Sequence, residues 1–305
     1  MKKTITKILI ICGPTGIGKS LLAVNLAKGF NAEIVGADSM QIYRKFNIGT
    51  GKITQDEMQG VAHHMIDILD PQEEYSVGRY VSDVKKVIEE VSIKGKNIII
   101  VGGTGLYLNA LTSGFNLAGV EKDVKLRERL TKMVDAHGNG YAYGLLKSKD
   151  AESAVKIAPA DTKRIIRALE IFELSGQGKS KRIESVLSDN YEFLQIVLLE
   201  ERERLYSKIN ARVDAMLASG LEDEARDLFK YAACQSASAI GYKEMFTYFS
   251  GELNLNAAID KIKQHSRNYA KRQITYFKWM KVVNKHFVDV GDVEKVKALV
   301  DNFWS

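Results

Sequence analysis

Runs of apolar residues in this chain are separated by segments with helical periodicity. Four of these runs have the length and composition of strands in the middle of a sheet: residues 8–11, 32–37, 97–101 and 193–199. Between the second and third runs, apolar residues recur every three or four positions in a segment that Ser76 can cap and Gly95 can end. Strands that alternate with helices predict an α/β fold, in which helices flank a parallel sheet.

A different pattern lies between the third and fourth apolar runs. From Glu121 to Asn190 the sequence is charged and helical, and it contains no strand-like run. Helices inserted between two strands of one sheet predict a separate domain. We therefore expect a core made of residues 1–120 and 191–305, and an inserted all-helical domain at residues 121–190.

The turn after the first apolar run carries the clearest chemical motif. Its sequence, Gly13-Pro14-Thr15-Gly16-Ile17-Gly18-Lys19-Ser20, fits the phosphate-loop pattern GxxxxGK[ST] at every fixed position. The motif lies between a predicted strand and a predicted helix, so its backbone N–H groups can turn towards phosphate oxygens. We expect Lys19 to neutralise the phosphate charge and the Ser20 hydroxyl to hold a Mg²⁺ ion. The pattern does not identify the phosphorylated ligand.

Polar residues follow the second and third predicted strands. Asp38-Ser39-Met40-Gln41 comes after one and Gly102-Gly103-Thr104-Gly105 after the other, and open α/β sheets bind ligands at this edge. Asp38 has three interpretations: a magnesium ligand, a base, or the N-cap of a helix. Thr104 either contacts the same ligand or belongs to a tight turn. His63 and His64 point to opposite faces of a strand, which favours structural imidazoles over a metal pair.

Composition narrows the class of protein. The chain has 305 residues, 45% of them hydrophobic, and 44 basic against 38 acidic side chains, for a net charge of +6 and a pI near 9.0. This balance favours an anionic partner such as nucleic acid. No segment has the length needed to span a bilayer, and the two cysteines, Cys12 and Cys234, cannot form a disulfide framework. We expect a cytoplasmic monomer without a membrane partner, with Cys12 in the core.

Basic residues concentrate in two later segments. In Lys163-Arg164-Ile165-Ile166-Arg167, the first and last residues share a helical face, which suits a solvated surface or a nucleic-acid contact equally. From Lys261 to His286 the chain has no acidic residue. Three basic residues there share a face and aromatic residues are interleaved with them, a pattern that suits RNA: Lys263, Arg267 and Lys271, with Tyr269, Tyr276, Phe277 and Trp279. For some of the aromatic residues, packing in the core is the better interpretation.

One arginine lies outside such clusters. Residues Arg202 to Gly220 form an amphipathic segment whose apolar stripe contains Leu205 and Ile209. Arg212 lies outside this stripe, which predicts a surface position.

Eight ordered motifs resemble those of one family. They are Gly13 to Ser20, Asp38 to Tyr43, His63 to Asp67, Val101 to Tyr107, Arg167 to Glu170, Arg212 to Leu217, Ala239 to Glu244 and Tyr269 to Gln273. With these motifs the chain closely resembles the bacterial tRNA dimethylallyltransferase family, also called tRNA isopentenyltransferases. The resemblance extends from about residue 7 to residue 280. The resemblance implies a P-loop NTPase-like core and a helical insertion that grips the tRNA anticodon stem-loop. It also implies transfer of a dimethylallyl group from dimethylallyl diphosphate to N6 of the adenosine immediately 3′ of the anticodon, with release of diphosphate.

The family's functional residues carry over onto matching residue types. The phosphate loop, Gly13 to Ser20, would bind diphosphate, with Mg²⁺ at Ser20. The resemblance gives catalytic roles to Asp38 as the general base, Arg212 and Lys19 at the diphosphate, and Thr104 beside the entering adenine. It implies tRNA contacts at Asp38, Ser39, Met40, Gln41, Thr104, Lys163, Arg164, Ile165, Ile166 and Arg167.

Three other functions remain open from the sequence. An adenylate isopentenyltransferase would use the same loop, Asp38 and Arg212 on a free nucleotide, although the insertion and the basic tail argue against it. A P-loop kinase would transfer phosphate from ATP. A non-catalytic RNA-binding protein would need neither Lys19 nor Asp38.

Overall fold

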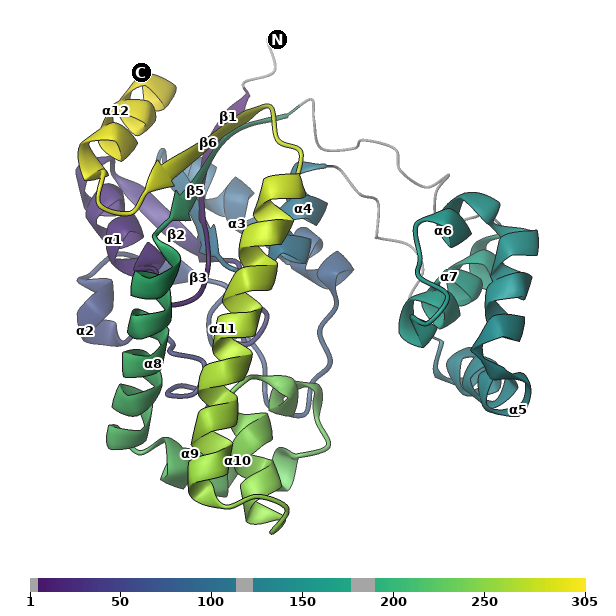
Figure 1. The fold of residues 1–305 in the computed structure, drawn as a ribbon. Helices are drawn as coiled ribbons and strands as arrows, with labels where there is room; N and C mark the ends of the chain where they lie inside the picture. Colours follow the sequence, from purple (N-terminus) through teal and green to yellow (C-terminus); the bar gives the residue numbers. More distant parts are fainter. Residues whose placement is uncertain (1–4, 114–122, 177–189) are drawn as a thin grey trace. The chain divides into compact units, whose positions relative to one another are not determined.

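The computed structural model describes residues 5–113, 123–176 and 190–305 (Figure 1). The chain divides into two compact units, one made of Met1–Asn109 and Asp189–Ser305 and the other of Ala110–Ser188. The first division lies earlier in the chain than the predicted boundary at residue 121, and the second lies just before the predicted one at residue 190.

One parallel sheet forms the centre of the first unit. Within the described residues its strand order is β3-β2-β4-β1-β5-β6, with all neighbours parallel. The strands are β1 (Thr6–Cys12), β2 (Ala32–Gly36), β3 (His63–His64), β4 (Asn97–Gly102), β5 (Tyr191–Leu199) and β6 (Asn284–Asp289). The four apolar runs are therefore confirmed as strands, and the predicted α/β fold with them. The edge strand β6 was not predicted, because only Val288 in it is buried.

Helices cover both faces of the sheet. The helix predicted after Ser76 is α3 (Val77–Ile93), where the Ser76 side chain accepts a hydrogen bond from the Arg79 backbone. The others in this unit are α1 (Lys19–Gly29), α2 (Gln55–Met58), α8 (Arg202–Ala218), α9 (Leu221–Leu228), α10 (Tyr242–Phe249), α11 (Leu255–Trp279) and α12 (Val293–Trp304). Helix α4 (Gly105–Thr112) begins in this unit, and the division between the units falls within it, after Asn109. On one face Leu9 and Ile11 of β1 share a core with α1 and α12, while α3 packs against β2 and β4. Cys12 is fully buried, as expected.

The second unit is helical in its described part. It contains α5 (Val124–Lys149), α6 (Ala151–Val155) and α7 (Thr162–Ser175), with a break in α5 at Gly138. A separate core of apolar residues joins these helices: Leu130, Ala142, Leu146, Ala154, Ile157, Ile165, Ala168 and Leu169. Across both units, the described helices include none that is long and apolar enough to cross a membrane.

Candidate active site

The phosphate loop occupies the turn between β1 and α1, as its sequence predicts. The Lys19 ammonium donates a hydrogen bond to the Pro14 carbonyl at 2.7 Å, so its side chain folds back over the loop. Burial, and next the positive charge of Arg212, lower the pKa of Lys19 to about 8. Ser20, in the first turn of α1, is exposed.

Asp38 follows β2 and caps a turn rather than a helix. Its Oδ1 accepts hydrogen bonds from the backbone N–H groups of Met40 at 2.9 Å and Gln41 at 3.3 Å. No helix begins at this position, so the N-cap interpretation is replaced by a capped turn. The two bonds fix the orientation of a half-buried carboxylate.

Thr104 connects the ends of β2 and β4. Its hydroxyl accepts a hydrogen bond from the Ser39 backbone at 3.0 Å, and its own N–H donates to the Ala37 carbonyl at 3.1 Å. The two strand-end loops therefore lie side by side, as their parallel strands predict. Thr104 itself lines neither of two hollows that lie at this edge of the sheet.

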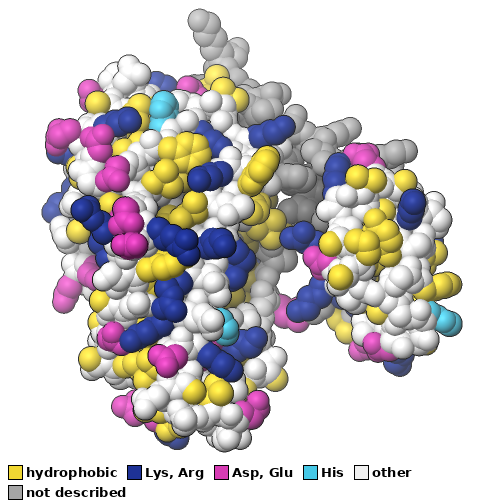
Figure 2. Space-filling view, in the orientation of Figure 1, with side chains coloured by type: hydrophobic (Ala, Val, Ile, Leu, Met, Phe, Trp, Pro, Cys, Tyr) yellow, Lys and Arg dark blue, Asp and Glu magenta, His cyan; other side chains and the backbone are white. Residues whose placement is uncertain are grey.

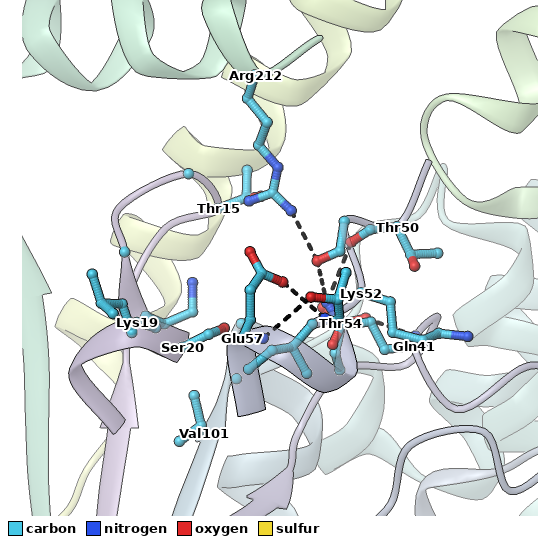
Figure 3. A pocket seen from close by; sticks show the side chains of 18 of the residues that line it. Thr15, Lys19, Ser20, Gln41, Thr50, Lys52, Thr54, Glu57, Val101 and Arg212 are labelled. Carbon is cyan, nitrogen blue, oxygen red and sulfur yellow. Dashed lines mark hydrogen bonds between the residues drawn. The ribbon is translucent and has the colours of Figure 1, made fainter. Parts of the chain in front are cut away.

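Two hollows meet at this edge of the sheet. The larger, about 630 Å³, is lined by the phosphate loop, Asp38, Gln41, the segment 47–54 and Arg212 (Figure 3). The smaller, about 270 Å³, is lined on one side by Ser39 and Met40 and on another by residues of α8 and α11. Six residues line both hollows and so mark their junction: Thr15, Asp38, Thr50, Arg212, Met216 and Tyr269.

Arg212 corrects a prediction from helical periodicity. The surface position expected for it is wrong, because its half-buried guanidinium points from α8 into the larger hollow (Figure 3). There Nη2 donates a hydrogen bond to the Gly51 carbonyl at 3.2 Å. Arg212 and Lys19 therefore bring two cationic groups to one hollow.

Gln273 has a role that the sequence interpretation missed. Its side chain is 5% exposed, and its Oε1 accepts from the Thr15 backbone at 2.8 Å while its Nε2 donates to the Gly103 carbonyl at 2.9 Å. One amide thus joins the phosphate loop to the loop after β4. The sequence contains a signal for this role, because Gln273 is a polar residue in the otherwise apolar stripe of α11 that includes Ala270 and Phe277.

The basic stripe of α11 is partly paired. Lys263 forms an ion pair with Asp214 at 2.6 Å, and Arg267 donates to the Asn210 side chain at 2.6 Å, so both residues join α11 to α8. Lys and Arg side chains gather on the face that carries these two helices (Figure 2). Among the interleaved aromatics, Phe277 is fully buried, whereas Trp279 is 82% exposed.

The predicted tRNA contacts of the second unit differ in exposure. Lys163 and Arg164 are exposed on α7, Ile166 is half-buried and Ile165 is fully buried. Burial of Ile165 removes its side chain from the predicted RNA contact, because it belongs to the core of this unit. Arg167 forms an ion pair with the fully buried Glu170 at 2.6 Å.

The two adjacent histidines are structural, as predicted. His63 Nδ1 lies 2.8 Å from the Val61 carbonyl, and His64 Nε2 lies 2.7 Å from the buried carboxylate of Glu33. Within the described ranges no group of three or more His, Cys, Asp and Glu side chains could hold a metal ion.

Comparison with known proteins identifies the family. The family model for IPP transferase matches residues 41–280. A tRNA dimethylallyltransferase of Caldanaerobacter subterraneus subsp. tengcongensis is 44% identical over 305 residues, which cover 98% of this chain and 96% of that protein. The crystal structure of the tRNA isopentenylpyrophosphate transferase of Bacillus halodurans has a TM-score of 0.72 at 39% identity and covers 97% of this chain and 96% of its own. A eukaryotic dimethylallyltransferase acting on tRNA has a TM-score of 0.81 at 28% identity, over 97% of this chain and 77% of that one. From its sequence and its fold alike, the chain belongs to the IPP transferase family.

Proposed function

We propose that this protein transfers a dimethylallyl group from dimethylallyl diphosphate to N6 of the adenosine immediately 3′ of the anticodon in tRNA. The observation that carries the proposal is the junction of the two hollows, where the phosphate loop, Asp38 and Arg212 meet. A diphosphate and an acceptor base need adjacent sites with a proton acceptor between them. Membership of the IPP transferase family supports the same activity.

The larger hollow suits the diphosphate. Lys19 and Arg212 both face it, and two cationic groups would offset the negative charge that grows on diphosphate as it leaves. These groups stand in a partly desolvated site, where their interaction with an anion is stronger than in water. We propose that they hold the leaving group in position for the bond to break.

A Mg²⁺ ion fits this hollow if the substrate supplies most of its ligands. Mg²⁺ prefers oxygen ligands and commonly combines one or two protein groups with phosphate oxygens and water. The Ser20 hydroxyl lines the hollow beside Lys19, whereas the described residues contain no acidic cluster for an all-protein cage. When bound, Mg²⁺ would neutralise part of the diphosphate charge, and Ser20 would be its protein ligand.

Asp38 is suited to accept the proton. In the reaction, N6 of the adenine forms a bond to the allylic C1, the bond from C1 to oxygen breaks, and diphosphate leaves with the electron pair. The proton on N6 then passes to the Asp38 carboxylate. Because the backbone bonds from Met40 and Gln41 hold Oδ1, we propose that Oδ2 faces the amine.

The smaller hollow suits the adenine. A base paired or stacked in folded RNA must leave the stack to reach such a site. Arg272 and Tyr269 of α11 line this hollow, and the basic face of the same helix carries Lys263, Arg267 and Lys271. We propose that this face and the exposed Lys163 and Arg164 contact the phosphates of the anticodon stem-loop. The monomeric state and the cytoplasmic location stay predictions.

Nucleoside analysis tests the activity. The protein is incubated with dimethylallyl diphosphate, Mg²⁺ and bulk tRNA that lacks the modification, and the digested nucleosides are analysed by mass. We expect an adenosine heavier by one dimethylallyl group, and release of diphosphate in equal amount. Release of ADP from ATP without a modified nucleoside would instead indicate a kinase.

A further inference from the structure

Glu224 of α9 holds the backbone of a distant turn. Its carboxylate accepts hydrogen bonds from three consecutive N–H groups, those of Asn47 at 3.2 Å, Ile48 at 2.9 Å and 3.1 Å, and Gly49 at 3.4 Å. Hydrogen bonds to a carboxylate are stronger than those between neutral groups. A single side chain therefore fixes the start of the segment that lines the larger hollow.

Tyr242 completes this clamp. Its hydroxyl donates to Glu224 at 2.5 Å and accepts from the Gly49 N–H at 3.0 Å. The ring is fully buried and so close to the turn that a Cβ atom on Gly49 would lie 2.5 Å from its Cε2. The turn can approach Tyr242 this closely only because residue 49 is glycine.

The same turn holds Arg212 on its other side. The Gly51 carbonyl accepts hydrogen bonds from Arg212 Nη2 at 3.2 Å and from Gln41 Nε2 at 3.3 Å. Gly51 lies two residues after Gly49, the last residue that the clamp holds, and its N–H donates to the Ile48 carbonyl at 2.8 Å. A shift of the clamped residues therefore moves the carbonyl that orients the guanidinium.

We propose that Glu224, together with Tyr242, is a positioning residue for the transfer reaction, acting through the Gly51 carbonyl on Arg212. Glu224 and Tyr242 are outside the described residues that line either hollow, so their effect on the substrate passes through the turn. The inference rests on the proposed function, in which Arg212 binds the diphosphate.

The test replaces Glu224 with an isosteric amide. In Glu224→Gln an N–H₂ donor faces the N–H donors of the turn, so at least one hydrogen bond is lost while the volume is kept. Glu222→Gln is the matched control, because Glu222 lies on the same helix and pairs with Arg226 at 2.9 Å instead of the turn. We expect kcat/KM for dimethylallyl diphosphate to fall about tenfold to a hundredfold in the first variant, as for a small misplacement of a catalytic group. The control should match the unaltered enzyme.

A double-mutant cycle separates positioning from a general structural role. If Glu224 acts through Arg212, the Glu224→Gln change should cost little in an Arg212→Ala background. Affinity for inorganic diphosphate with Mg²⁺, measured by calorimetry, should show the same coupling without turnover. Tyr242→Phe removes a single hydroxyl from the clamp and should repeat the result more weakly, so the test survives if Glu224→Gln does not fold.

Three outcomes are distinguishable. Equal losses for Glu224→Gln with and without the Arg212 side chain would overturn the positioning role. Full activity of Arg212→Ala would contradict the assignment of Arg212 to the diphosphate. Absence of transfer by the unaltered enzyme would contradict the proposed function itself.

Discussion

Gly51 is the position where one added methyl group most directly displaces Arg212. Its φ is +56°, and a Cβ atom there would lie 1.6 Å from Arg212 Nη2. To restore an ordinary contact of about 3.5 Å, the guanidinium must move by roughly 2 Å. Displacing a catalytic group by about 1 Å can cost about a hundredfold in rate, so we expect Gly51→Ala to lower kcat/KM by about a hundredfold or more.

A second glycine controls for the backbone cost of this change. Gly95 has a similar φ of +67°, and a Cβ atom there would meet nothing within 4 Å. Alanine in the left-handed region costs about 1–2 kcal/mol, so both variants should lose at least this free energy of unfolding in urea. Gly95→Ala should keep its activity.

Steady-state transfer from labelled dimethylallyl diphosphate to tRNA is the assay for both variants. Activity of Gly51→Ala within a few-fold of the unaltered enzyme would show that the reaction does not need Arg212 in its observed place. An equal loss in Gly95→Ala would attribute the effect to destabilisation instead.

Four further results follow from the site and its surroundings. Asp38→Ala should lower kcat by about two to four decades with tRNA affinity unchanged, and near-normal turnover would leave Asp38 only its turn-capping role. Burial, followed by the charge of Arg212, lowers the pKa of Lys19 to about 8, so its ammonium is lost as pH rises through that value. KM for dimethylallyl diphosphate should therefore rise above about pH 8, and Lys19→Arg should flatten this dependence of KM on pH. Burial alone would raise the pKa of Glu33, but hydrogen bonds from Lys96, His64 and Lys94 lower it from 4.5 to about 2. Its stabilisation, up to about 3 kcal/mol, is thus present above pH 4.5 and lost as pH falls towards 2, and Glu33→Gln should remove this part of the acid dependence of urea unfolding. Neutralising Lys163 and Arg164 together should reduce the slope of log Kd for tRNA against log salt by up to about 2, whereas an unchanged slope would place them outside the RNA interface.

The elements of the core were predictable because their signals are local. The apolar runs of β1, β2, β4 and β5 and the periodicity of α3 reflect burial that each segment shows by itself. The phosphate loop was predictable for the same reason, since its backbone geometry requires particular residues at fixed spacing.

The details of the site depend on contacts between distant segments, which periodicity does not contain. Arg212 lies outside the apolar stripe of α8. Its polar face lines a hollow because the turn at Gly51, which is distant in the sequence, packs against it. Gln273 and Glu224 form hydrogen bonds with backbone groups, and the pattern of side chains along the sequence does not reveal such partners. The exposed edge strand β6 has too few buried residues to give a signal.

Transfer to tRNA and to AMP, measured side by side with the same enzyme, dimethylallyl diphosphate and Mg²⁺, decides which acceptor the protein uses. The product is identified by nucleoside mass and located by sequencing the RNA fragment that carries it. We expect one dimethylallyl group on the adenosine immediately 3′ of the anticodon and no measurable transfer to AMP. Efficient transfer to AMP, with none to tRNA, would contradict the proposed function.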